Sequence, residues 1–566
     1  MTSPAVNKIK YECKHAVYAP SNDPESRDDL VVVKEIQHLP DGTKKPNLRL
    51  IRNYKRSFYL TREAYRDHKD NKEWESINRL QKFTCRQSDL VDRIGQSLGY
   101  RRFRDIGHAG SCEYLYGSDI TTPTLIKHKY MEQWPDAISD NSVAVLDIET
   151  DVLNEDNLGK PIYIALTFRD KAFLVVTERF LGSIANPEEQ FQSMFTKYLG
   201  KYKEERNINL EVVVTNDLAD GIVQVINKAH EWKPDFLTFW NIDFDLPIIS
   251  KVLVDNGYDL AQVFSDPSVP DEFKYYKYTK GKSKKETASG LVMSIHPAER
   301  WHIAECPASF FLIDSMCVYK RIRMAKANEN SYSLDSILNK HLKLGKLNFK
   351  EAESVTDGGL KWHKFMQAKY KIEYGIYCLF DCIGVELLDE KTRDLAAVIS
   401  AHSKASEYTI FNSQPQRLIN DIYFYCLEIG KVIGSYGRGK DELDKFVVGL
   451  KDWIVTLPSH LVETKGIPLL KELPQVFSFC YAHVADLDIV STYPNVQYIL
   501  NISKETTYRE ISRVGKATVG DIRMAGINLS GGYVNAVEVV CSLYKAPTFD
   551  TLLEDFVKEK NIEAIL

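Results

Sequence analysis

An apolar run that ends in two acidic residues is the feature that most constrains the fold of this chain. Residues 143–146 read Val-Ala-Val-Leu, and Asp147 and Glu149 follow directly. The run predicts a β-strand, and residues two apart on a strand point to the same face, so both carboxylates should lie side by side. Neighbouring carboxylates repel each other unless a cation neutralises them. The solvated end of an ordinary strand would show the same pattern.

A second apolar run, residues 236–240, leads into Asn241 and then into an amphipathic helical pattern. Within that pattern Asp245 could add a third carboxylate, and Asn241 could position the chain or a substrate. Alternatively, Asp243 or Asp245 caps the N-terminus of the helix.

A third segment carries a tyrosine and an aspartate at helical spacing. Tyr377 and Asp381 are separated by one turn, so on a helix they share a face, about 5–6 Å apart at Cβ. A core tyrosine beside a surface acid is the alternative. Cys378 and Cys382 have the same spacing, but the sequence offers no further ligands for a metal site between them.

In this order the three segments resemble the Exo I, Exo II and Exo III motifs of the proofreading exonuclease in family B DNA polymerases, which is of the DEDDy type. The matching patterns are D-x-E, N-x-x-F-D and Y-x-x-x-D. Many viral members have one more residue in the second motif, which leaves the role of Asp243 open. Residues 311–319 and 331–335 also resemble the tailed-phage members of this family.

The resemblance implies an RNase H-like exonuclease domain that hydrolyses DNA in the 3′→5′ direction. Two metal ions roughly 3.5–4 Å apart would make a nucleophile from water and stabilise the leaving alkoxide. Mg²⁺ suits carboxylate ligands, and Mn²⁺ could substitute for it. Asp147 would bridge the ions, and Tyr377 would orient the attacking water. The implied metal ligands are Asp147, Glu149, Asp245 and Asp381, and Asn241 is implied to contact the DNA.

A further strand-like segment reads V-A-D-L-D-I-V-S-T-Y-P at residues 484–494. The pattern D-x-x-S-x-Y-P resembles motif A of the family B polymerase palm. Its spacing selects Asp488 rather than Asp486 as the catalytic metal ligand. The residues implied to hold the nucleoside triphosphate are Ser491, Thr492 and Tyr493.

The other polymerase motifs of this family, K-x-x-x-N-S-x-Y-G and D-T-D-S, do not occur after Asp488. Residues 431–437 superficially resemble the first, but they precede motif A and are interpreted as a glycine-rich loop. We therefore expect DNA synthesis from primer-template and dNTP to need a second polypeptide with the rest of the palm, the fingers and the thumb. A sliding clamp is a further candidate partner. A stand-alone exonuclease with a vestigial palm, or a non-catalytic scaffold that binds primer-template DNA, are the rival interpretations.

A lysine-rich turn interrupts the exonuclease segment just after Tyr275, Tyr276 and Tyr278. We expect its lysines to contact phosphates of single-stranded DNA, with the tyrosines able to stack on bases. A solvated loop is the alternative. The lysines concerned are Lys280, Lys282, Lys284 and Lys285.

Composition sets only loose limits on partners and compartment. The net charge of −5 means that DNA binding would have to depend on local basic patches. No apolar run is long enough to cross a membrane, and the N-terminus lacks the apolar core of a signal peptide. The 10 cysteines include no C-x-x-C pair, which favours a reducing cytoplasm, the host's if the chain is phage-encoded.

A chain of 566 residues should form several domains, and alternating strand and helix patterns indicate an α/β multidomain fold. Strands are expected at 162–168 and 172–176, and helices at 187–199 and 222–232. The expected divisions are an N-terminal α/β domain (1–135), the exonuclease domain (136–395), a return segment entering the palm (396–480), and a partial palm with motif A and the start of the fingers (481–566).

Overall fold

A computed structural model describes residues 9–68, 72–99, 101–286, 292–345, 347, 349, 359–435, 527–529 and 532–534. The chain forms two compact units, residues 1–449 and residues 450–566. The predicted polymerase residues Asp488, Ser491, Thr492 and Tyr493 lie outside the described residues.

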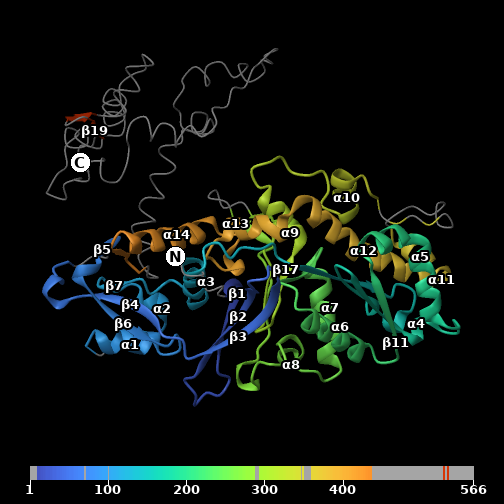
Figure 1. Ribbon diagram of the computed structural model, residues 1–566, viewed down its shortest axis with the longest axis horizontal. Coiled ribbons are helices and arrows are strands. Elements are labelled where there is room, and N and C mark those ends of the chain that lie inside the picture. Colours follow the sequence, from blue (N-terminus) through green and yellow to red (C-terminus); the bar gives the residue numbers. More distant parts are fainter. Residues whose placement is uncertain are drawn as a thin grey trace, which may run out of the picture. The chain divides into compact units, whose positions relative to one another are not determined.

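A mixed sheet of eight strands forms the centre of the first unit, as the α/β prediction requires (Figure 1). In spatial order its strands are β11 (Asn209–Thr215), β10 (Lys171–Thr177), β9 (Pro161–Phe168), β8 (Val143–Thr150), β12 (Phe236–Phe239), β17 (Phe311–Asp314), β16 (Ile303–Glu305) and β13 (Lys277–Thr279).

Strand β8 lies between an antiparallel neighbour, β9, and a parallel one, β12. Strand β10 is antiparallel to β9 because only a two-residue turn at Arg169 and Asp170 joins them, and Arg169 has a positive φ of 59° there. The chain reaches β12 and β17 through longer connections that contain helices, which allows both strands to run parallel to β8.

Helices cover both faces of this sheet. One face carries α5, α10, α11 and α12, whose apolar side chains share a core with Val145 of β8. The other face carries α6, α7 and α8, which share a core with Leu146 and Ile148. The bounds of the helices in this part are α4 (Glu178–Leu181), α5 (Pro187–Arg206), α6 (Leu218–Trp232), α7 (Ile242–Asp255), α8 (Leu260–Phe264), α9 (Ser315–Ile322), α10 (Leu334–Leu342), α11 (Leu360–Lys369) and α12 (Lys371–Thr392).

The strands and helices expected at 162–232 are confirmed, and each is longer than predicted by one to seven residues at an end. Every residue of β9 is buried, because both faces of the strand are covered by helices. The observed ends extend past the apolar periodicity because polar residues continue the backbone hydrogen bonding.

The N-terminal part contains two small antiparallel sheets, with the strand orders β1-β2-β3 and β6-β4-β7. Helix α3 packs on the first of them. The elements are β1 (Lys10–Pro20), β2 (Asp29–His38), β3 (Lys44–Arg52), β4 (Arg56–Thr61), β5 (Trp74–Ser76), β6 (Leu80–Cys85), α1 (Leu90–Ser97), α2 (Ile106–Ala109), β7 (Leu115–Tyr116) and α3 (Thr122–Gln133).

After α12 the chain returns to the N-terminal part through α13 (Ile399–Ser403), α14 (Gln414–Glu428) and β18 (Lys431–Ile433). Strand β18 pairs with β5, so the glycine-rich loop expected at 431–437 is wrong for its first three residues. The segment is extended because Lys431–Ile433 forms backbone hydrogen bonds with the edge of β5. The two strands are far apart in the sequence, so no local pattern predicts this pairing.

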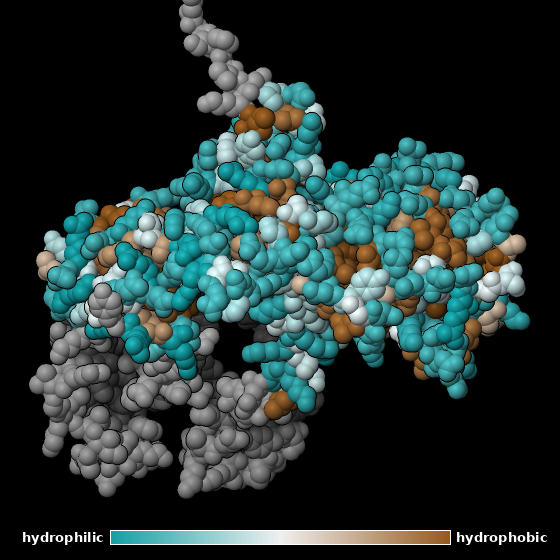
Figure 2. Space-filling view, turned by 90° about the horizontal axis from the view of Figure 1, so that it is seen from below, coloured by the Kyte–Doolittle hydropathy of each residue, from teal (hydrophilic) through white to brown (hydrophobic). Residues whose placement is uncertain are grey.

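Much of the surface seen in Figure 2 is hydrophilic, with apolar patches in separate places. Among the described residues, no helix is long and apolar enough to cross a membrane. In the second unit the described elements are β19 (Ile527–Leu529) and β20 (Gly532–Val534), which pair as an antiparallel hairpin.

Candidate active site

The first two acidic side chains project from strand β8 on the face that helix α12 covers. Its alternating residues Leu146 and Ile148 enter the core under α6 and α7, so Asp147 and Glu149 project from the opposite face. Both acidic residues are half-buried, and Cys378 of α12 places its Sγ 3.6 Å from an oxygen of Asp147. The predicted common face of the two carboxylates is confirmed.

Helix α12 brings the third carboxylate to the same point. Ligand oxygens of Asp147, Glu149 and Asp381 all lie within 4.8 Å of one another, the only such cluster of three metal-ligand residues in the described part of the chain. Three carboxylates this close repel one another, and a bound cation would relieve the repulsion. The geometry therefore fits a divalent metal ion coordinated by oxygen.

Tyr377 lies one turn before Asp381 on α12, as predicted, and is buried. Burial raises the pKa of Tyr377 well above its ordinary value, and the charge of Asp381 raises it further. The phenol therefore stays protonated and can donate a hydrogen bond. Such a group can hold a water molecule in place, but it does not act as a base.

Asp245 borders this cluster without joining the 4.8 Å group. It is 4% exposed, and its Oδ1 has no hydrogen-bond partner among the described residues. Burial raises the pKa of its carboxyl group well above the ordinary value, and the charges of Glu149 and Asp314 add to the effect. An unpartnered buried oxygen beside three carboxylates is where a second cation would be most stabilising.

Asp314, at the end of β17, fixes the start of helix α7. One of its oxygens accepts from the backbone N–H of Ile242 at 3.0 Å and the other from that of Cys317 at 2.7 Å. Burial raises the pKa of Asp314 to about 7 against the lowering effect of these bonds. Asp314 therefore does the capping that the alternative interpretation gave to Asp243 or Asp245, and Asn241 makes no side-chain cap hydrogen bond.

Helix α11 and the first turn of α12 hold Glu149 in place. The Tyr374 hydroxyl donates to Glu149, and His363 Nδ1 donates to the Tyr374 oxygen at 2.7 Å. Gln367 Nε2 donates to the carbonyl of Thr150 at 2.8 Å, which fixes the backbone just after Glu149. Sequence reasoning missed all three positioning residues, although Tyr374 lies one turn before Tyr377 on the same helix face.

Asp243 forms a separate cluster with the base of the lysine-rich turn. Lys280 Nζ lies 2.9 Å from its Oδ2, and the Tyr278 hydroxyl donates to its Oδ1 at 3.0 Å. The lowering effect of these two partners outweighs burial, so the pKa of Asp243 lies below its ordinary value. Lys280 therefore has an intramolecular partner, while Lys282, Lys284 and Lys285 are exposed.

The three tyrosines before the lysine turn are half-buried and have partners within the protein. Tyr276 stacks on Phe264, and Tyr278 stacks on His302. The Tyr275 hydroxyl donates to the Tyr18 carbonyl at 3.2 Å. Tyr276 and Tyr278 pack against the core under α7 and α8, and stacking of the tyrosine rings on bases stays a prediction.

A cavity of about 1050 Å³ is lined by segments that carry or adjoin the acidic residues. Its polar lining includes Asp151 and Asn154 after β8, Lys251 and Asp255 of α7, Gln367 of α11, and Lys371 of α12. None of the four acidic residues Asp147, Glu149, Asp245 and Asp381 lines this cavity, so it adjoins the candidate site rather than containing it.

No model of a known protein family matches this sequence, and no curated protein is significantly similar to it.

Proposed function

We propose that this chain is a Mg²⁺-dependent 3′→5′ exonuclease acting on single-stranded DNA, as the proofreading part of a family B DNA polymerase. The observation that carries the proposal is the convergence of Asp147, Glu149 and Asp381 within 4.8 Å, brought about by β8 and α12. Asp245 and Tyr377, predicted from the same motifs, lie beside the cluster.

The sheet supports the RNase H-like fold that the resemblance implies. The five strands β10, β9, β8, β12 and β17 are neighbours in that order, and β9 alone is antiparallel to the others. Helices on both faces and acidic residues on the central strand agree with the same fold.

Each side chain has a role that follows from its surroundings. Asp147, Glu149 and Asp381 would hold Mg²⁺, with Asp245 completing the coordination of a second ion. When bound, the ions supply a water of lowered pKa and stabilise the leaving alkoxide. The protonated Tyr377 hydroxyl orients the attacking water by donating a hydrogen bond.

The direct test uses the purified chain and a single-stranded DNA labelled at its 5′ end. Degradation is expected to shorten the strand from its 3′ end with Mg²⁺ or Mn²⁺ and to stop with EDTA. A DNA-binding scaffold would retain the strand without shortening it, so intact DNA under these conditions contradicts the proposal.

Tyr374→Phe is expected to lower nuclease activity about tenfold at limiting Mg²⁺, because Glu149 loses a charge-assisted hydrogen bond. Saturating Mg²⁺ should restore most of the rate, since the metal itself then orders Glu149. The measurement is the Mg²⁺ dependence of the rate. Tyr370→Phe is the matched control, because the Tyr370 hydroxyl has no hydrogen bond among the described residues. A rate loss that Mg²⁺ does not restore would point to a general folding defect.

Replacing Lys282, Lys284 and Lys285 by Ala is expected to weaken single-stranded DNA binding and flatten its salt dependence. Each phosphate contact contributes about 0.7 to the slope of log affinity against log salt in single strands. Fluorescence anisotropy at several salt concentrations measures the slope. Ala at the exposed Lys44, Lys45 and Lys55 provides an equal change of charge. An equal slope in both variants would favour the solvated-loop interpretation.

The polymerase role is proposed from motif A alone, since Asp488 lies outside the described residues. On this proposal the chain extends primers only together with a polypeptide that carries the remaining motifs, and Asp488→Ala stops synthesis while exonuclease activity persists. Primer extension by the chain alone would contradict the need for a partner.

A further inference from the structure

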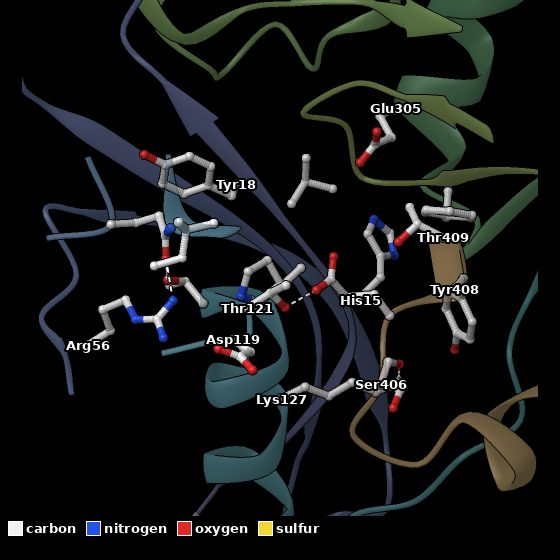
Figure 3. A pocket seen from close by; sticks show the side chains of 18 of the residues that line it. His15, Tyr18, Arg56, Asp119, Thr121, Lys127, Glu305, Ser406, Tyr408 and Thr409 are labelled. Carbon is white, nitrogen blue, oxygen red and sulfur yellow. Dashed lines mark hydrogen bonds between the residues drawn. The ribbon is translucent and has the colours of Figure 1, made fainter. Parts of the chain in front are cut away.

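A second cavity, of about 300 Å³, lies in the first unit where β1, α3, β16 and residues 406–409 meet. Figure 3 shows side chains from these elements facing it, with Glu305 and Thr409 toward one end and Arg56 and Asp119 toward the other. None of the proposed exonuclease residues lines it. The volume suits a compact small molecule rather than a nucleic-acid strand.

The cavity offers hydrogen-bond acceptors that the protein leaves unused. The Glu305 side chain makes no hydrogen bond or ion pair with any described residue. His15 is 5% exposed, and its Nε2 lies 3.3 Å from the carbonyl of Ala308, which places the proton on Nε2. His15 Nδ1 is therefore a lone-pair acceptor, and it has no hydrogen-bond partner in the part of the chain that the structure describes.

Glu407 is a third acceptor group on this cavity. It accepts hydrogen bonds from the hydroxyls of Thr121 and Thr124, but no cationic group lies within ion-pair distance of it among the described residues. Burial raises the pKa of both Glu305 and Glu407, and the charge of Glu305 raises that of Glu407 further. Two acids therefore repel each other across one cavity, and a cationic ligand would offset the repulsion.

The protein's own cations on the cavity are engaged elsewhere. The Lys127 ammonium donates to the Ser406 carbonyl at 3.3 Å and lies 4.7 Å from the centre of the Tyr408 ring. Arg56 donates to Gln87 and to the Ser118 carbonyl. Neither forms an ion pair with Glu305 or Glu407 in the described part of the chain.

The arrangement does not suit a single metal ion. Outside the candidate active site, no three acidic, histidine or cysteine ligands of the described residues converge within 4.8 Å. The acceptors are instead spread along the wall of the cavity, beside apolar side chains such as Val17 and Phe311. An extended ligand with cationic N–H donors at its ends and an apolar middle matches this distribution.

We propose that this cavity binds a small aliphatic diamine, with one ammonium group on Glu305 and His15 Nδ1 and the other on Glu407. The methylene chain lies against the apolar wall, and the positive charge of Arg56 closes the far end to longer polyamines. Bound there, the ligand would join β1 and residues 406–409 to strand β16. Such binding would be independent of nuclease activity.

The experiment is calorimetric titration of the full chain, free of DNA and at constant ionic strength, with 1,4-diaminobutane as the probe. One saturable site per chain is expected, and Glu305→Gln or Glu407→Gln should weaken the affinity about tenfold or more. Glu25→Gln, at an exposed site away from the cavity, should bind as the unchanged chain does. Butylamine should bind more weakly, because it offers only one ammonium group.

Thermal unfolding without ligand separates loss of the site from loss of the fold. Glu305→Gln should be at least as stable as the unchanged chain, because it removes a charge that forms no ion pair with any described residue. Butyrate binding more tightly than the diamine would overturn the proposal in favour of an anion site at Arg56. Absence of binding, or equal diamine affinity in the Glu305→Gln variant, would mean that the cavity holds only water.

Discussion

Replacement of both Asp147 and Glu149 by Ala is expected to abolish the Mg²⁺-dependent shortening of single-stranded DNA. Two of the three clustered ligands are removed, so neither metal ion keeps its protein ligands. Metal ions contribute several kcal/mol of transition-state stabilisation, so the rate should fall at least about a thousandfold. The measurement is the initial rate of 3′ shortening under single-turnover conditions.

The matched control is Ala at Glu204 and Glu205, two exposed acids on α5 that change the net charge equally. This variant should degrade DNA at the unchanged rate. Both variants should bind single-stranded DNA, because removing acidic groups strengthens rather than weakens attraction to phosphates. Similar degradation by the double variant and the control would refute the exonuclease assignment.

The acidic cluster could be predicted because its parts follow local periodicities. The period of two on β8 puts Asp147 and Glu149 on one face, and the period of 3.6 on α12 puts Tyr377 over Asp381. That the strand and the helix meet was not deducible from either period. It was inferred from a resemblance in motif order.

The supporting residues could not be predicted in the same way, because their partners are distant in the sequence. Asp314 caps a helix that begins 72 residues earlier, and Tyr374 reaches a carboxylate 225 residues away. Separations of 72 and 225 residues leave no periodic pattern in the sequence. Such contacts become visible only when the strands are placed side by side.

The packing of two tyrosines beside the lysine turn did have a local signal. Tyr276 and Tyr278 alternate with Lys277 and Thr279, which is the period of a half-buried strand. Their proximity to the lysine run favoured a stacking role, whereas the alternation correctly places both rings against the core. For these two tyrosines, the period of two predicts how the rings pack in the free protein.

Asp381→Asn is expected to stabilise the metal-free protein while abolishing its response to metal. Asp381 is 8% exposed and lies with two other carboxylates, so a neutral side chain of equal size removes repulsion without creating a cavity. In EDTA the melting temperature of the variant should therefore exceed that of the unchanged chain. The unchanged chain should gain stability with Mg²⁺ or Mn²⁺, by about 2.7 kcal/mol when free metal is a hundred times the Kd.

The variant should lose most of this metal-dependent gain, together with its nuclease activity, since a ligand of the cluster is gone. Asp156→Asn is the control, because Asp156 is exposed and outside the cluster, and it should keep both the gain and the activity. Thermal unfolding with EDTA, Mg²⁺ and Mn²⁺ gives all the comparisons in one experiment. An equal metal-dependent gain in both variants would place the metal elsewhere. A lower melting temperature of Asp381→Asn in EDTA would mean that hydrogen bonds to the Asp381 carboxylate outweigh the repulsion among the three acids.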